Sequence, residues 1–386
     1  MPSISPRWQQ GVVSRQAHRG LPPNTFEREV GREGFNGPSA QFYHRRPPTD
    51  WIGFEGDLKP QAWQLANSPA VDHLFDVPPI LSSRSSTVTY WHSKKSSSHL
   101  SRNSDGDMIF FLHQGNADMF CDYGHLRIER GDYLVMPKGT MWRIETQEDC
   151  HILVIETTGQ RVRIPDRGLL GHHALFDPAR LDIPKLDDKF QAQEDRAYRV
   201  IVKRLGKQSY IDYSYNPLDA IGWVGDLAPV RLNVRDIMPV NSHRVHLPPS
   251  VHATFETDRL MVSTFVPRPF ETDDTALKVP FFHSNEDVDE VIFYHDGEFF
   301  SRDGIQPGTM SFHPAGFTHG PQSKAQLNMF NQSNTKTNEV AVMIDAFDPY
   351  QTLQISDLAS HESSKNDCGS IGKMEIQDYV GRWMRD

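Results

Sequence analysis

The chain contains few cysteines and no long apolar stretch, and both shortages restrict the classes of protein to which it can belong. Only Cys121, Cys150 and Cys368 occur among 386 residues, with no CxxC spacing. This argues against a disulfide-rich secreted scaffold and indicates free thiols in a reducing compartment. No apolar run approaches the roughly 18 residues that span a bilayer, and the N-terminus lacks the apolar region of a secretory signal. We therefore expect a cytoplasmic protein with no membrane partner.

Clusters of basic residues are also missing. The formal net charge is −10, and Arg45-Arg46 and Lys94-Lys95 are isolated pairs. A nucleic-acid footprint requires a longer basic patch, so no nucleic-acid partner is expected. The length suits two ordinary domains or one large two-lobed domain.

Helical periodicity is sparse, whereas short strands and turn residues are common. The chain has 27 prolines and 26 glycines, which suit many turns. Short segments rich in β-branched and aromatic residues predict strands at 151–157, 260–266 and 339–347. The best helical candidates are 189–207 and 374–386. The pattern predicts a mainly β fold.

The most informative residues are His283, Glu290 and His319. They lie in VPFFHSNEDVDEVIFYHDG (279–297) and GTMSFHPAGFTHGP (308–321), where the spacings Glu-x6-Gly and Gly-x5-Pro-x-Gly-x2-His occur in order. These are the two half-motifs of the cupin barrel, a small double-stranded β-helix of jelly-roll type. Two imidazoles and one carboxylate can hold one face of a metal and leave the other open, as in non-haem Fe(II) enzymes. The alternative is a barrel whose polar residues are only hydrogen-bonded.

A weak internal repeat accompanies these half-motifs. Gly131 begins a Gly-x5-Pro-x-Gly-x2 pattern that reproduces the segment from Gly308 to His319, 177 residues later. Trp142 takes the position of the terminal histidine, and Asp107 lies about where the glutamate would lie. We infer two cupin barrels, of which the N-terminal one is degenerate. The alternative is that this pattern is a common strand-turn-strand motif that carries no evidence of duplication.

These observations predict five segments. They are an N-terminal wrapping segment (1–60), a degenerate N-terminal cupin lobe (61–180), a helical connector (181–210), a C-terminal metal-binding cupin lobe (211–355) and a C-terminal loop and helix (356–386).

The sequence resembles a known family around the metal motifs and beyond them. The segments that carry the resemblance to the shorter bacterial branch of the homogentisate 1,2-dioxygenases are VHLPPSVHATF, FHSNEDVDEVIFY, FHPAGFTHGP, 31–49, 221–236 and 339–351. The resemblance implies a two-lobed cupin that uses Fe(II) and O2 to open the ring of 2,5-dihydroxyphenylacetate (homogentisate) to maleylacetoacetate, in tyrosine and phenylalanine catabolism. It places the iron ligands on His283, Glu290 and His319.

The resemblance also implies roles around the metal. His246 matches the family's acid/base histidine, and His252 is the competing position. His313, Arg302 and Phe282 are the expected substrate-binding residues. The implied partners are a small aromatic acid and O2, and we expect a homo-oligomer.

Alternative functions stay open from the sequence. Phe281 and Phe282 stand where the family often has tyrosine, which leaves the aromatic substrate undecided. A related hydroquinone, gentisate or salicylate is the first alternative. A non-oxidative metal-dependent cupin isomerase and a binding protein are the others.

Three further histidines are expected to play no part in the metal site. His295 lies five residues after Glu290 on a predicted strand, so period-two alternation directs it to the opposite face. His113 and His125 are interpreted as surface or loop residues.

Overall fold

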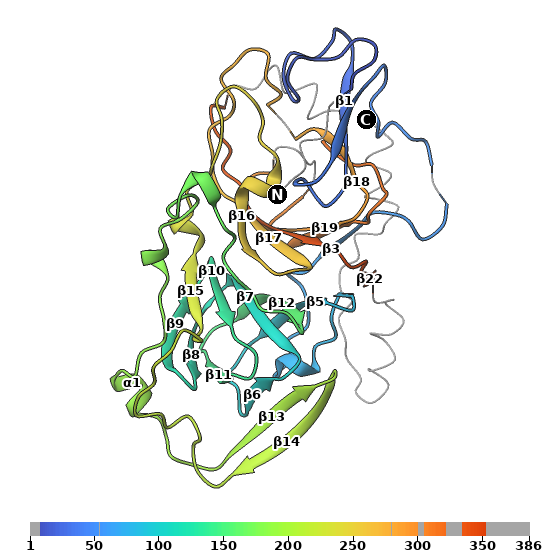
Figure 1. The fold of residues 1–386 in the computed structure, drawn as a ribbon. Helices are drawn as coiled ribbons and strands as arrows, with labels where there is room; N and C mark the ends of the chain where they lie inside the picture. The colour runs from blue at the N-terminus through green and yellow to red at the C-terminus, as the bar shows by residue number, and fades with distance from the viewer. Residues whose placement is uncertain (1–7, 54, 279, 300–304, 322–333, 353–386) are drawn as a thin grey trace.

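The computed structural model describes residues 8–53, 55–278, 280–299, 305–321 and 334–352. The chain is mainly β and forms two lobes, one above the other in Figure 1. Four sheets account for its strands, two in each lobe. The predicted mainly β, two-lobed cupin architecture is confirmed.

Two sheets build the N-terminal lobe. The seven-stranded sheet runs in the order β15-β10-β7-β12-β5-β4-β22, and the six-stranded sheet in the order β14-β13-β6-β11-β8-β9. In chain order these strands are β4 (Leu81–Ser82), β5 (Ser86–Ser93), β6 (Leu100–Asn103), β7 (Gly106–Gln114), β8 (Asn116–Cys121), β9 (Gly124–Glu129), β10 (Asp132–Met136), β11 (Met141–Glu145), β12 (Cys150–Thr158), β13 (Tyr198–Arg204), β14 (Lys207–Tyr213), β15 (Val230–Asn233) and β22 (Gln351–Thr352).

The C-terminal lobe is built from the other two sheets. One is six-stranded, in the order β16-β17-β21-β19-β20-β3, and the other is three-stranded, in the order β18-β1-β2. Their strands are β1 (Phe26–Gly31), β2 (Ser39–His44), β3 (Gln61–Gln64), β16 (Ala253–Glu256), β17 (Leu260–Phe265), β18 (Phe282–Asn285), β19 (Asp289–Asp296), β20 (Thr309–His313) and β21 (Val340–Ala346).

Helices are few and short in the described part of the chain. They comprise α1 (Asp188–Gln191) and the 3-10 turns Leu74–Asp76, Gly168–Leu170, Pro178–Arg180, Val234–Asp236 and Pro249–His252. No helix among the described residues has the length and apolar character required to cross a membrane.

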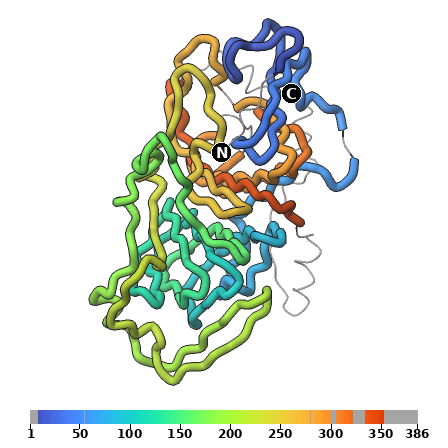
Figure 2. The backbone as a smooth tube through the Cα atoms, viewed as in Figure 1, coloured from blue at the N-terminus to red at the C-terminus, as the bar shows by residue number. Residues whose placement is uncertain are grey.

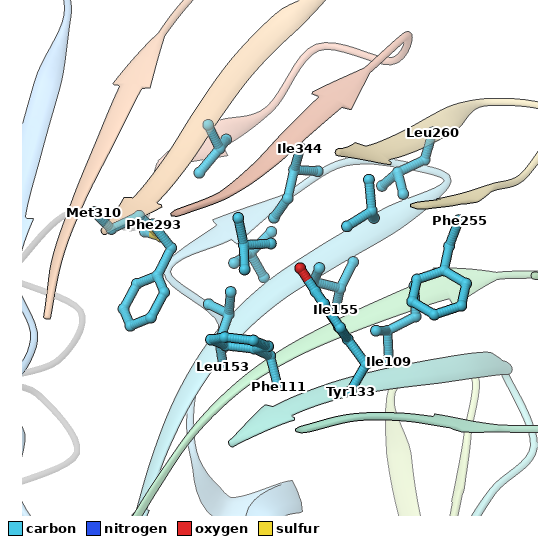
Figure 3. Packing of buried hydrophobic residues seen from close by; sticks show 14 of the residues in the cluster. Ile109, Phe111, Tyr133, Leu153, Ile155, Phe255, Leu260, Phe293, Met310 and Ile344 are labelled. Atoms are coloured by element: carbon cyan, nitrogen blue, oxygen red, sulfur yellow. The ribbon is translucent and has the colours of Figure 1, made fainter. Parts of the chain in front are cut away.

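The lobes pack through an apolar layer between the seven-stranded sheet and the sheet of β19. Side chains from both lobes interdigitate there, as Figure 3 shows for Phe111 and Tyr133 of the first lobe and Phe255, Phe293 and Ile344 of the second. Burial of each such side chain stabilises the fold by roughly 1.5–3 kcal/mol. Because strand side chains alternate, every second residue of β19 faces this layer and the others face the interior of the barrel.

The layer also contains a buried histidine pair. His113 and His295 lie with their Nδ1 atoms 2.9 Å apart, and both side chains are buried. The predicted position of His295 on the strand face opposite Glu290 is therefore confirmed. The interpretation of His113 and His125 as surface residues is wrong, because His113 sits between the lobes and His125 is buried between Asp118 and Asp187.

The strands that precede each lobe in sequence pack on the other lobe. The β1–β2 hairpin joins β18 in parallel, with Glu29 opposite His283, and the β13–β14 hairpin joins β6 in parallel, with Ile201 opposite Ser101. In Figure 2 the blue N-terminal segment accordingly lies beside the orange chain of the C-terminal lobe. β3 pairs with β20, and β15 pairs with β10. The expected boundaries at 61 and 211 are wrong for these two strands, which belong to the opposite lobes.

The predicted helical connector is also wrong over most of its length. Only α1 is helical, and the hairpin of β13 and β14 follows it. Leu205 and Gly206 have φ angles of 52° and 68°, the left-handed values that suit a tight two-residue hairpin turn. The β-branched run 200–202 gains sheet pairing with β6, which an isolated helix would forgo. The expected C-terminal helix lies outside the described residues.

Candidate metal centre

Three side chains from separate elements meet inside the C-terminal barrel. His283 lies on β18, Glu290 on β19 and His319 in the segment after β20. The backbones of His283 and His319 pair as a bridge, with N···O distances of 2.8 and 3.0 Å. Their Nε2 atoms lie 3.4 and 3.3 Å from the Glu290 carboxylate oxygens, and one ligand atom from each residue lies within 4.8 Å of the others. The structure therefore brings the predicted triad together.

Hydrogen bonds at the far side of each imidazole fix its tautomer. The Nδ1 atom of His283 lies 3.1 Å from the carbonyl oxygen of Phe281, and that of His319 lies 2.9 Å from the carbonyl oxygen of Phe317. A carbonyl only accepts, so Nδ1 carries the proton and Nε2 presents its lone pair. Within the described part of the chain, neither Nε2 atom has a hydrogen-bond partner. Buried acceptors that lack a donor fit a cation.

The charges at the centre agree with this fit. Burial would raise the pKa of Glu290, but His319 and the neighbouring imidazoles of His283 and His313 hold it well below its usual value. Burial lowers the pKa of His319, and the nearby His283 lowers it further, although Glu290 opposes both. An ionised Glu290 beside a neutral His319 is the protonation state that metal ligation requires.

His313 lies beside the triad. It is fully buried on β20, stacks on His319 at 4.4 Å with an interplanar angle of 8°, and has Nδ1 3.2 Å from a Glu290 oxygen. Its position across the strand pair from Glu290 directs it toward the same interior. Its substrate-binding role stays a prediction.

A pocket opens from the triad toward the solvent. Its lining combines His283 and Glu290 with aromatic, aliphatic and polar side chains: His246, Leu247, Pro249, His252, Phe265, Arg268, Pro280, Phe281, Ile292, Tyr294, Gly320, Pro321, Glu339, Ala341 and Met343. A mostly apolar cavity with a few convergent polar groups is typical of a small-molecule site.

The two candidate acid/base histidines have different surroundings in this pocket. His246 has its Nδ1 atom 2.8 Å from Oε1 of Glu271, so the carboxylate can hold the Nδ1–H tautomer and leave Nε2 as the base. His252 is 4% exposed, and burial, with the charges of Arg268 and His246, lowers its pKa to about 3. His252 is therefore a neutral buried ring, whereas a carboxylate orients the ring of His246.

The predicted substrate residue Phe282 is replaced in the pocket by its neighbour. Phe281 lines the pocket, whereas Phe282 is fully buried and packs edge-on against Phe26. Alternation along β18 explains this correction, because Phe281 and His283 share one face and Phe282 points to the other. Arg302 lies outside the described residues, so its predicted contact with substrate stays a prediction.

Sequence reasoning missed several residues around the centre. Phe35 of the N-terminal segment contacts the ring of His283 at 5.2 Å, and His18 stacks on Phe281 at 3.8 Å. Glu271, Arg268 and Glu339 also reach the pocket or its histidine. None of these belongs to a spaced motif, so the sequence offered no signal for them apart from the wrapping role expected of residues 1–60.

Equivalent backbone hydrogen bonds align the two barrels residue by residue. Lys138 N donates to Asp107 at 2.8 Å, and Ala315 N donates to Asp289 at 2.7 Å, so these two aspartates correspond. Asp107 therefore does not occupy the glutamate position, and the prediction is wrong by one residue. The position of Glu290 is taken by Met108, because strand pairing places Met108 one residue after Asp107 as Glu290 follows Asp289.

The barrel pair, the two half-motifs and the buried His-Glu-His cluster define a two-lobed cupin with a candidate metal centre in its C-terminal lobe. A family model for the N-terminal part of homogentisate 1,2-dioxygenase matches residues 76–234. This match and two relatives support a relationship between the chain and the homogentisate 1,2-dioxygenases.

Two relatives and one solved structure are similar to the chain. The chain is 29% identical over 338 residues to a Saccharolobus solfataricus protein provisionally named a dioxygenase, covering 83% of this chain and 86% of that protein. It is 27% identical over 273 residues to homogentisate 1,2-dioxygenase of Dictyostelium discoideum, covering 67% of this chain and 61% of that enzyme. Among solved structures, a cupin 2 conserved barrel domain protein from Leptotrichia buccalis matches 77% of this chain and 92% of its own, with 9% identity and a TM-score of 0.31.

Proposed function

We propose that the protein is an Fe(II)-dependent dioxygenase that opens the ring of homogentisate with O2 to give maleylacetoacetate. The observation that carries the proposal is the buried triad of His283, Glu290 and His319, of which His283 and Glu290 line a largely apolar pocket. Three protein ligands on one side leave room for substrate on the other, as non-haem iron chemistry requires. The similarity to homogentisate 1,2-dioxygenases and to a second dioxygenase-named relative supports a dioxygenase.

When bound, Fe(II) would supply the redox chemistry through which O2 reacts with an electron-rich ring. The chain's own contribution is to hold the ligands and the ring in place. Phe281, Phe265 and Tyr294 line the pocket and can enclose an aromatic ring away from water. Glu290, kept ionised beside the imidazoles, offsets part of the charge of a divalent cation.

His246 is the proposed acid/base. Its Nδ1–H donates to Glu271 at 2.8 Å, which leaves Nε2 to take a phenolic proton from the ring. Removal of that proton makes the ring more electron-rich, so oxygen attack becomes easier. The cytoplasmic location and homo-oligomeric state belong to the same proposal.

Anaerobic loading with Fe(II), followed by O2 uptake with homogentisate, gentisate and hydroquinone, tests the function. We expect O2 consumption coupled to loss of the aromatic absorbance, with homogentisate turned over fastest. Faster cleavage of gentisate or hydroquinone by tenfold in kcat/KM, about 1.4 kcal/mol, would reject the substrate and keep the dioxygenase.

One alternative keeps specific support. Phe281 contributes no hydroxyl to the pocket, so a less polar hydroquinone is the second candidate substrate. Product formation without O2 would instead identify an isomerase, and binding without turnover would identify a binding protein.

A further inference from the structure

The pocket has a second polar end that the metal centre does not use. Arg268 follows β17, Glu339 precedes β21, and His252 ends a 3-10 turn, and all three line the pocket. On β19, Tyr294 lies four residues after Glu290, and it pairs with Ala341, which is two residues from Glu339. Four residues of strand span roughly 13 Å. That length suits a substituted aromatic ring between the triad and this polar end.

Arg268 is held rigidly at this end. One guanidinium N–H donates to Glu339 Oε1 at 3.2 Å, its backbone N–H donates to Thr337 at 3.1 Å, and its guanidinium lies over Phe265 at 5.4 Å. The side chain is nine-tenths buried. The bond to Glu339 uses one of the five N–H groups that a guanidinium carries, so donors remain for a ligand in the pocket.

His252 adds a second observation at the same end. Its side chain is buried, and among the described residues its Nδ1 atom has no hydrogen-bond partner. Buried polar atoms ordinarily find a partner. A polar group of a bound ligand would provide one, while Phe265 holds the ring of His252 from the side at 5.4 Å.

We propose that Arg268 and His252 form a subsite for the ionised carboxylate arm of the aromatic substrate, and that Glu339 competes with that carboxylate for Arg268. A guanidinium matches a carboxylate with two parallel hydrogen bonds, and it stays charged at any working pH. The apolar lining between the two ends, with Ile292, Met343 and Ala341, would cover the ring. This inference rests on the proposed function for the nature of the ring, but it concerns binding alone.

Because Glu339 competes for Arg268, the proposal predicts opposite changes in affinity for an acid when Glu339 or Arg268 is neutralised. Burial raises the pKa of Glu339, while Arg268 opposes that rise. The attraction between the two charges is therefore partly offset by their loss of hydration. A carboxylate ligand would share Arg268 with Glu339. Neutralising Glu339 should therefore strengthen binding of an acid, whereas neutralising Arg268 should weaken it.

The test measures binding without turnover. Fe(II)-loaded protein under nitrogen is titrated by calorimetry with homogentisate and with methylhydroquinone, which has the same ring and lacks the carboxylate. For Arg268→Gln we expect homogentisate affinity to fall about tenfold or more, close to 1.4 kcal/mol, with methylhydroquinone affinity almost unchanged. For Glu339→Gln we expect tighter homogentisate binding and unchanged methylhydroquinone binding.

Two further variants guard against misfolding. Arg268→Gln/Glu339→Gln leaves no unpaired buried charge, and it should still lose the preference for the acid. Arg143→Gln removes another buried arginine that pairs with a glutamate, Glu145, in the N-terminal lobe, and it should keep the preference.

Equal weakening of both ligands in Arg268→Gln and in the double variant would overturn the subsite, because that pattern marks a structural role. Weaker acid binding in Glu339→Gln would also overturn it. Failure of the proposed function looks different: an Arg268-dependent preference for the acid without O2 uptake rejects the dioxygenase and keeps the subsite. Conversely, O2-dependent ring cleavage with a preference independent of Arg268 keeps the dioxygenase and rejects the subsite.

Discussion

The two barrels share a backbone plan but differ in what fills them. At the four corresponding positions the C-terminal lobe has His283, Glu290, His313 and His319, and the N-terminal lobe has Ser101, Met108, Met136 and Trp142. In the first lobe Trp142 is fully buried against Trp91 and Phe110, within an apolar cluster. One interior is a packed core, and the other is a polar site.

Residues common to the two barrels explain how one backbone plan supports a packed core in one lobe and a polar site in the other. Asp107 and Asp289 each accept a backbone N–H from the turn that ends the second half-motif, and each accepts a second one, from Val162 or Tyr350. These hydrogen bonds hold the turn in both lobes, whether the residue after it is His319 or Trp142. The carboxylates that brace the fold are thus separate from Glu290, which faces the pocket.

A second acid shows the same contrast. Glu156 and Asp345 occupy corresponding positions beside Met108 and Glu290, and Lys203 donates to Glu156 at 2.6 and 2.7 Å. Among the described residues, neither carboxylate oxygen of Asp345 has a hydrogen-bond partner. Burial, together with the nearby Glu290, raises the pKa of Asp345 well above its usual value. Glu156 of the N-terminal lobe thus has a cationic partner, whereas none of the described residues of the C-terminal lobe hydrogen-bonds the Asp345 carboxylate.

The largest expected effect comes from removing the triad. His283→Ala, Glu290→Ala or His319→Ala should abolish turnover and most iron binding, because each removes one of three ligands. Metal analysis of the wild-type protein should give about one iron per chain, since the described residues offer one such triad and Trp142 takes the ligand position in the other lobe. Trp142→Phe in the other lobe is the control, and iron near two per chain would contradict the comparison.

The next effect concerns the acid/base within the polar interior. His246→Gln should lower kcat by roughly 10²- to 10⁴-fold while iron content stays near wild type. The reason is that Gln cannot take the phenolic proton. His173→Gln, an exposed histidine of the N-terminal lobe, is the matched control. Steady-state kinetics with metal analysis decides, and an unchanged kcat would contradict the role of His246.

Placing the glutamate in the wrong barrel should be costly. Met108→Glu should destabilise the protein by about 3–5 kcal/mol, because the new carboxylate would enter an apolar cluster beside Glu156, whose partner Lys203 is already engaged. Met108→Leu is the control and should cost less than about 1.5 kcal/mol. Urea unfolding measures both. Equal midpoints for the two variants would show that the first barrel tolerates the chemistry of the second.

The smallest effect tests the layer between the barrels. Burial, followed by the charge of His295, lowers the pKa of His113 to about 3, and burial with Arg130 lowers that of His295 to about 4. Both rings bind protons more readily when unfolded, so stability is complete above about pH 6.5 and falls as the pH drops toward 4.

Urea midpoints of metal-free protein at pH 7.5 and pH 5 measure this loss. His113→Gln should reduce the difference between the two midpoints, because one buried ring that must stay neutral is gone. Arg130 and Asp296, which face the pair, are unchanged in the variant. A midpoint that rises on acidification would contradict the prediction.

Part of the candidate site could be predicted because it is local in sequence. The spacing from Glu290 to Gly297 and from Gly308 to His319 fixes strand, turn and return within a few residues, so the candidate ligands could be predicted from the sequence. The same spacing exposed Trp142 in the degenerate repeat. Strand alternation separates the side chains of Phe281 and Phe282, and Phe281 is the one that lines the pocket, although the resemblance implied Phe282.

The sequence by itself determined the mainly β class, the duplication and the triad, because strand alternation and turn residues are local physical constraints. Only the tertiary structure decided that each lobe receives the hairpin preceding the other lobe, and that Glu271, Arg268 and Glu339 meet the pocket. These contacts join residues far apart in the chain with no recurring spacing. They depend on how whole sheets pack, which short-range patterns do not encode.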